Sequence, residues 1–144
     1  SGSITAFYTV LLEGDIKSDP ISEEVVSLLD GHIFLSKKLA EAGHFPAIDV
    51  LPSISRIMSN IVSNEHNIAA GKVRKILSCY QNMELLIRLG EYKRGLDADV
   101  DAMIDMYPQV VSMLKQNTKI PENWNENLHR LYALFDNTPE KLGG

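Results

Sequence analysis

The stretch "PAIDVLPSISRIMSN", residues 46–60, carries one arginine, Arg56, among small, apolar and uncharged polar residues. Asp49 is the only other charged residue in it. A guanidinium stays cationic at any ordinary pH, and its planar donors suit a carboxylate or a phosphate. From the residues alone two interpretations stay open. Arg56 binds an anionic ligand, or it pairs with Asp49 or is simply exposed.

Other patterns that could do chemistry are incomplete. The phosphate-loop pattern GxxxxGK[ST] is absent, because Gly71-Lys72 is followed by Val73 inside an expected helix. "DADVDAMIDMYP" begins like a calcium loop, but Ala102 replaces the turn glycine and Pro108 stands where the bidentate glutamate belongs. The four histidines lack zinc spacing, and no GxSxG elbow accompanies the serines. No metal site is predicted, and the chain lacks a complete active site of its own.

Composition limits the remaining classes of function. The 144 residues are 44% apolar and 23% charged, as in folded globular domains, and the formal net charge is −5. An acidic chain with scattered basic residues does not suit nucleic acid. The apolar run "AFYTVLL" is too short to cross a membrane. The single cysteine, Cys79, lies on an apolar helical face, which predicts a buried, inert thiol and a reducing cytosol.

The first half of the chain alternates strands and short helices. Ile4–Leu12 is rich in β-branched and aromatic residues and predicts a buried strand. A short helix should follow Asp19, a second strand should span residues 30–36, a short helix should end at Gly43, and "FPAIDV" should be extended.

The second half is purely helical. Apolar residues recur at spacings of three and four over residues 65–89, 98–116 and 124–135, and the predicted buried faces include Ile68 and Trp124. Ser63 or Asn64 should cap the first helix and Gly90 should end it, whereas Pro108 should kink or divide the second. The predicted fold is an α/β remnant followed by an all-α part, with a boundary at residues 60–65.

Three strings carry a family resemblance: "GSITAFYTVLLEGD", "DGHIFLSKKLAEAGHFPAIDVLPSISRIM" and "LLIRLGEYKRG". In this order and spacing they closely resemble the C-terminal part of type III secretion ATPases, the export ATPases of bacterial injectisomes and flagella. These ATPases are relatives of the catalytic subunits of rotary ATP synthases. The resemblance covers Gly2 to about Phe135, and the wording "GEYKRG" favours the injectisome branch.

The resemblance implies a division of the chain at residue 63. Residues 1–63 would be the last strands and helices of a RecA-like P-loop NTPase domain, and residues 64–144 a C-terminal helical bundle. The family's full-length protein is a homohexamer at the cytoplasmic face of the bacterial inner membrane. It uses ATP and Mg²⁺ to release chaperones and to unfold and export proteins, including virulence factors. Its Walker A, Walker B and catalytic glutamate motifs are missing from this sequence, so the chain alone should not hydrolyse ATP.

The resemblance also implies roles for individual residues. Arg56, in "SISR", matches an arginine finger that reaches the terminal phosphate bound by the neighbouring subunit. Phe45 occupies the place of an aromatic residue that stacks on adenine, although from the residues alone it is a core residue. Four acidic residues would face the central stalk protein, or would merely keep a loop soluble: Glu91, Asp97, Asp99 and Asp101.

Further partners implied by the family are a peripheral stator or regulator protein and export chaperone–effector complexes. The alternative function is a non-catalytic docking module for the stalk and for chaperone–substrate complexes. Without neighbouring strands, Ile4–Leu12 would present an unpaired edge, which predicts self-association of the chain.

Overall fold

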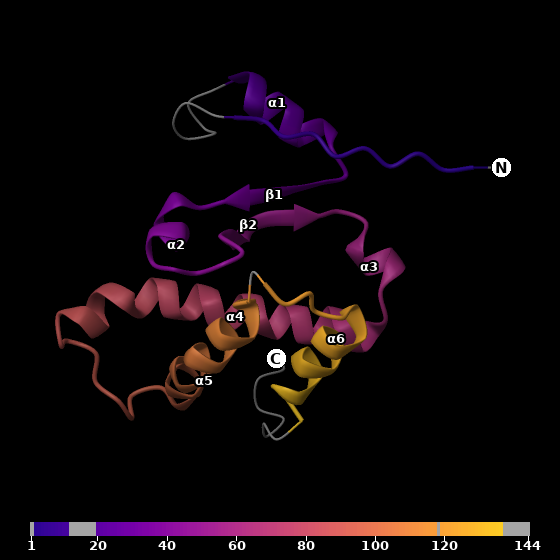
Figure 1. Ribbon diagram of the computed structural model, residues 1–144. Coiled ribbons are helices and arrows are strands. Elements are labelled where there is room, and N and C mark those ends of the chain that lie inside the picture. The colour runs from indigo at the N-terminus through magenta and orange to yellow at the C-terminus, as the bar shows by residue number, and fades with distance from the viewer. Residues whose placement is uncertain (1, 12–19, 118, 137–144) are drawn as a thin grey trace.

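The structure is a computed structural model that describes residues 2–11, 20–117 and 119–136. A two-stranded sheet with short helices lies on one side of the long helix α4, and α5 and α6 lie on the other side (Figure 1). The elements in chain order are α1 (Pro20–Leu28), β1 (Gly31–Leu35), α2 (Lys37–Glu41), β2 (Ile48–Ser55), α3 (Met58–Ile61), α4 (Asn64–Arg88), α5 (Ala98–Leu114) and α6 (Trp124–Ala133).

The sheet consists of β1 and β2 in antiparallel register. Gly31 pairs with Ser55 at one end and Leu35 pairs with Ile48 at the other, with an irregularity between them. The expected strand at residues 30–36 and the helix ending near Gly43 are confirmed. The extended segment predicted from "FPAIDV" begins later than expected and runs on to Ser55.

Helix α4 has the ends that its sequence predicts. The Ser63 hydroxyl accepts a hydrogen bond from the backbone N–H of His66, which satisfies one of the free donors of the first turn. At the other end Gly90 adopts a positive φ of 70°, a conformation that side chains with a Cβ disfavour. The helix between them has 25 residues and a length of about 37 Å.

The hydrophobic core lies between α4 and α5, and α6 covers its side. Ile76 of α4 and Val110 of α5 are fully buried, and burial of each side chain contributes about 1.5–3 kcal/mol to folding. Cys79, which was expected to be buried, is half-buried against this core, and burial raises the pKa of its thiol. The buried core residues are Val73, Ile76, Met103, Met106 and Val110.

The buried strand predicted for Ile4–Leu12 is wrong over the residues that the structure describes. Residues 4–11 form no strand, and the side chains of Ile4 and Phe7 are 99% and 91% exposed. A strand needs a neighbour to receive its backbone hydrogen bonds, and in the described chain only β1 and β2 pair. Leu12 lies outside the described residues.

Some expectations about the helices need correction. Of the two alternatives for Pro108, division is excluded, because α5 runs from Ala98 to Leu114 as one helix, and a kink stays a prediction. Met106 and Val110, on both sides of the proline, are buried in the core. Ile68 and Trp124, predicted to be buried, are exposed. Both lie at the margin of the helical part, where helical periodicity is present but packing is incomplete.

Candidate functional site

Arg56 stands where the two-stranded sheet ends. Its backbone N–H donates to the carbonyl oxygen of Asp30 at 2.8 Å, one step beyond the last strand pair. Its guanidinium is exposed and makes one long contact, 3.5 Å, from Nη2 to the carbonyl oxygen of Val26. No carboxylate of the described residues pairs with it, and Asp49 Oδ1 instead accepts from the N–H of Leu51. The side chain therefore offers its donors to solvent.

Gly31 permits the close approach of β1 to β2 next to Arg56. A Cβ atom on Gly31 would lie 2.8 Å from the carbonyl oxygen of Ile54 and 3.4 Å from Cα of Ser55. Both contacts are to backbone, which cannot rotate away. A residue without a side chain at this position thus lets β2 pass close to β1 immediately before Arg56.

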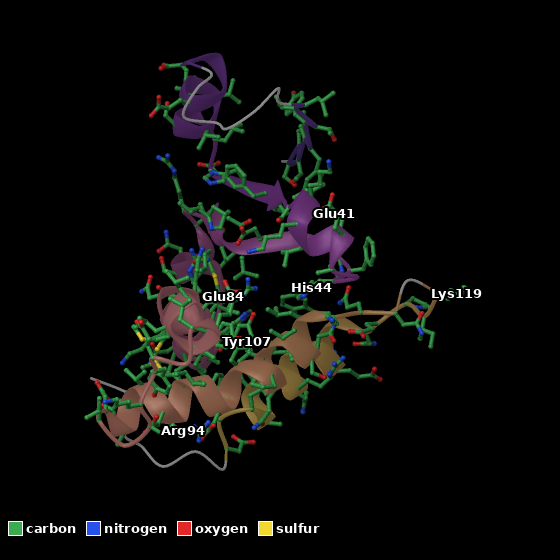
Figure 2. The ribbon with its side chains drawn as sticks, turned by 90° about the vertical axis from the view of Figure 1, so that its left-hand side faces the viewer. Glu41, His44, Glu84, Arg94, Tyr107 and Lys119 are labelled. Atoms are coloured by element: carbon green, nitrogen blue, oxygen red, sulfur yellow. The ribbon has the colours of Figure 1, made fainter. Side chains whose placement is uncertain are left out.

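Phe45 lies at the other end of β2, in the loop that precedes the strand. The residue is 44% exposed, so it is not a core residue, and its carbonyl oxygen accepts from the N–H of Gln116 at 2.8 Å. The neighbouring His44 is buried, and burial, followed by the positive charge of Lys115, lowers the pKa of its imidazole. Figure 2 shows His44 on the side of the C-terminal end of α5. The loop of Phe45 thus rests on the helical part.

The connection between α4 and α5, together with the first turn of α5, uses two of its acidic residues internally. Asp97 caps α5 by accepting from the N–H groups of Asp99 and Val100 at 2.9 and 3.1 Å. Asp101 accepts from the hydroxyl of Tyr92 and, at 2.8 Å, from the N–H of Gly95.

The side chains of this connection influence one another's ionisation. The hydrogen bond to Asp101 raises the pKa of Tyr92 to about 12, and the same bond holds the pKa of Asp101 below its usual range. Arg94, at the opposite end of α5 from His44 in Figure 2, pairs with Asp105. Glu91 and Asp99 make no side-chain hydrogen bond or ion pair with any described residue. These two carboxylates therefore remain available to a partner.

Sequence reasoning missed Arg74 of α4. Its guanidinium donates to the backbone carbonyl oxygens of Val50, Leu51 and Ser53 in β2, at distances of 2.7–3.1 Å. The available signal was an arginine directly after Val73, a buried position of the helix. Its partners are backbone atoms of a distant strand, which a periodic pattern does not reveal.

Comparison with models of protein families shows to which family the chain belongs. Residues 62–133, half of the chain, match the family model described as the T3SS EscN ATPase C-terminal domain. The chain belongs to the type III secretion and flagellar ATPase family. Residues 1–55 match the nucleotide-binding domain of the ATP synthase alpha/beta family. The short strands are thus the end of a nucleotide-binding domain, and a C-terminal helical domain follows them.

Individual members of the type III secretion and flagellar ATPase family agree with this assignment. The SPI-2 type 3 secretion system ATPase of Salmonella typhimurium is 53% identical over 90% of this chain, which spans 31% of that protein. The flagellum-specific ATP synthase of Bacillus subtilis is 50% identical over 94% of the chain, again 31% of its length. These similar identities do not separate the injectisome from the flagellar branch, so the branch remains a prediction.

Solved structures of secretion ATPases share the fold. The assembled ATPase EscN of enteropathogenic E. coli superposes with a TM-score of 0.84 at 46% identity, covering 92% of this chain and 32% of EscN. EscN in complex with its central stalk EscO gives a TM-score of 0.74 at 43% identity, covering 80% of this chain and 28% of EscN. The chain therefore spans about a third of the length of these relatives.

Neither a metal site nor a membrane segment is found in the described part of the chain. No group of three or more His, Cys, Asp or Glu side chains is placed to hold a metal ion among the described residues. None of the helices in the described ranges is long and apolar enough to cross a membrane.

Proposed function

We propose that this chain is the C-terminal part of a homohexameric ATPase that energises type III protein secretion, and that Arg56 is its arginine finger. The observation that carries the proposal is the exposed guanidinium of Arg56, which has no carboxylate partner among the described residues. An exposed arginine at the end of an ordered strand suits an anion brought by another subunit.

The opposite positions of Phe45 and Arg56 support a site shared between subunits. They flank β2, which runs from Ile48 to Ser55, so they do not lie together around one ligand. We propose that Phe45 contacts the adenine bound to its own subunit, because an aromatic face suits a purine ring. Arg56 then meets the terminal phosphate bound to the neighbouring subunit.

The chemistry of Arg56 would be electrostatic. ATP with Mg²⁺, held by residues outside this chain, supplies the phosphoryl group that is transferred to water. The guanidinium stabilises the negative charge that builds up on the phosphoryl oxygens in the transition state. Its planar donors hold those oxygens in a fixed geometry, which an ammonium group does not do.

The helical domain is proposed to receive the partners of the secretion apparatus. The connection between α4 and α5 lies at the far end of α4 from α3 (Figure 1). Together with the first turn of α5, it offers the free carboxylates of Glu91 and Asp99, and exposed leucines accompany them. We define the stalk surface as Leu85, Leu89, Glu91, Leu96 and Asp99. This mixture of apolar and acidic groups suits a coiled coil with basic residues, and EscN has been solved with its central stalk EscO.

Docking by the helical domain is also the second candidate function of the chain taken alone. The motifs for phosphate binding are missing from the sequence, so the purified 144-residue chain should bind the stalk without hydrolysing ATP. In the full-length ATPase the same domain would also receive export chaperone–effector complexes and a peripheral stator protein. This assembly would act at the cytoplasmic face of the bacterial inner membrane.

Substitution of Arg56 in the full-length ATPase tests the finger. Arg56→Ala should lower kcat by about 10³-fold or more, the range that such fingers contribute in related hydrolases. The matched control is Lys37→Ala, which removes an exposed cation of α2 that forms an ion pair with Glu41 of the same helix. The control should leave kcat unchanged, because an exposed ion pair contributes under about 1 kcal/mol to stability.

Light scattering must show that both variants still form hexamers. A hexamer of Arg56→Ala with the kcat of the unchanged ATPase would remove the finger assignment. It would leave the docking function of the helical domain standing.

A further inference from the structure

Strand β2 contains a bulge just before Arg56. His32 of β1 pairs with Ile54, and Phe34 pairs with Asp49. One residue of β1 therefore stands opposite four residues of β2, Val50 to Ser53, where regular pairing would place one. Extra residues leave the hydrogen-bond ladder, so their backbone groups need other partners.

Every carbonyl oxygen of this bulge accepts a hydrogen bond from a side chain. Arg74 of α4 donates through Nη1 to Val50 at 2.8 Å and to Ser53 at 3.1 Å, and through Nη2 to Leu51 at 2.7 Å. His32 Nε2 lies 2.9 Å from the carbonyl oxygen of Pro52 and must be the donor, because a carbonyl oxygen only accepts. One guanidinium thus holds three of the four carbonyl groups.

Arg74 makes this contact from the helical domain. It is half-buried and forms no ion pair with a described carboxylate, so the bulge carbonyls are its charge-stabilising partners. The adjacent residues Val73 and Ile76 are buried in the core and fix the helix at this point. These hydrogen bonds therefore connect the bulge of β2 directly to a well-packed part of α4.

Arg56 follows the bulge by three residues. Between them Ile54 and Ser55 pair with β1, and the N–H of Arg56 donates to Asp30. The backbone position of Arg56, from which its side chain extends, therefore depends on where the bulge is held. The guanidinium of Arg56 itself has only its long contact to Val26, so it contributes little to its own placement.

We propose that Arg74 is a positioning residue for Arg56, holding β2 on α4 so that the guanidinium of Arg56 reaches the nucleotide of the neighbouring subunit. The inference rests on the proposed finger role of Arg56. It makes hydrolysis at one subunit depend on a residue in the helical domain of the next. The planar fork of an arginine is required, because its two terminal nitrogens reach carbonyl oxygens on both sides of the bulge.

The experiment uses mixed rings of the full-length ATPase with two kinds of subunit. The reporter subunit carries Arg56→Ala and binds ATP but cannot supply a finger. The donor subunit lacks the phosphate-loop lysine of the full-length protein, so it supplies a finger but cannot hydrolyse ATP. Activity then arises only where the finger of a donor meets the nucleotide of a reporter, and Arg74→Met is introduced into one kind of subunit at a time.

Arg74→Met in the donor should lower the kcat of mixed rings about tenfold to a hundredfold, with KM for ATP unchanged, because a small misplacement of a catalytic group is costly. The same substitution in the reporter should leave kcat unchanged, since that subunit has no finger to position. A general structural defect would lower activity from either subunit. The matched control, Lys75→Met, changes the exposed neighbour of Arg74 and should have no effect in the donor.

The outcomes separate this inference from the proposed function. If unchanged donors fail to activate reporters, the finger role of Arg56 is wrong. If they succeed and Arg74→Met donors activate equally well, Arg74 does not position the finger. If Arg74→Met donors do not enter rings, Arg74→Lys is introduced instead, and the kcat of mixed rings is again compared with the substitution in the donor and in the reporter. Arg74→Lys keeps the charge but not the fork, so an intermediate kcat is expected, and unchanged activity overturns the inference.

Discussion

Arg56 and Arg74 carry the same functional group in opposite surroundings. The guanidinium of Arg74 is half-buried and held by three carbonyl oxygens, whereas that of Arg56 is exposed with one long contact. The surroundings of Arg74 indicate a structural role that connects α4 to β2. The surroundings of Arg56 suit an anionic ligand bound by another subunit. The sequence directed attention to Arg56 through its neighbours and its family resemblance. For Arg74 the sequence offers only its place beside the buried Val73, because the carbonyl groups that Arg74 binds belong to a bulge without a sequence signature.

Gly31 provides a prediction at the scale of one residue. Gly31→Ala should destabilise the chain by about 1–3 kcal/mol, because the new methyl group would overlap the backbone of Ile54. The matched control is Gly71→Ala within α4, where a Cβ meets nothing within 4 Å. The control should be neutral or stabilising by up to about 1 kcal/mol, since alanine is the better helix former.

Urea denaturation of the two glycine variants measures both effects. Gly31→Ala should lower the free energy of unfolding, whereas Gly71→Ala should leave it unchanged or raise it. If Gly31→Ala were as stable as the unchanged chain, β1 and β2 would not approach as closely as the structure shows.

At the scale of elements, sequence signals that act within a few residues predicted where helices begin and end. They predicted less well which residues and strands pack against one another. The start of α4 follows from a serine cap and its end from Gly90, both of which act within a few residues. The strand expected at Ile4–Leu12 does not form over residues 4–11, because a strand depends on a neighbour rather than on its own composition. Likewise, helical periodicity placed Ile76 and Val110 in the core correctly but also predicted burial of Trp124, which is 67% exposed.

The α4–α5 connection gives a prediction about stalk binding. The double variant Glu91→Lys and Asp99→Lys should weaken binding of the central stalk protein about tenfold at low salt, because each exposed pair contributes up to about 1 kcal/mol. Asp97 and Asp101 are left unchanged, since they cap α5 and hold Tyr92 and Gly95, and their reversal would disrupt the loop itself.

Glu126→Lys is the control for this charge reversal. Glu126 is also an exposed acidic residue in the first turn of a helix, α6, but it lies outside the stalk surface. Calorimetric titration should show weaker binding for the double variant alone. Equal affinities for all three proteins would exclude the acidic residues as stalk contacts.

At the scale of the whole molecule, the chain exposes surfaces that suit partners. The side chains of Ile4, Phe7 and Leu11 are almost fully exposed, which is unusual for large apolar residues. The purified chain should therefore self-associate and show a mass above 16.1 kDa by light scattering. Replacement of Phe7 and Leu11 by serine should shift the mass toward that of the monomer. If the chain without substitutions were strictly monomeric, this expectation would be contradicted.

The central claim is that Arg56 acts on the nucleotide of a neighbouring subunit. The most direct test is the ATPase activity of mixed rings formed from Arg56→Ala subunits and subunits that lack the phosphate-loop lysine, with no other change. Each kind alone should be nearly inactive, and the mixture should recover activity well above the sum of the two. Mixed rings that form but show no activity above that sum would contradict the claim.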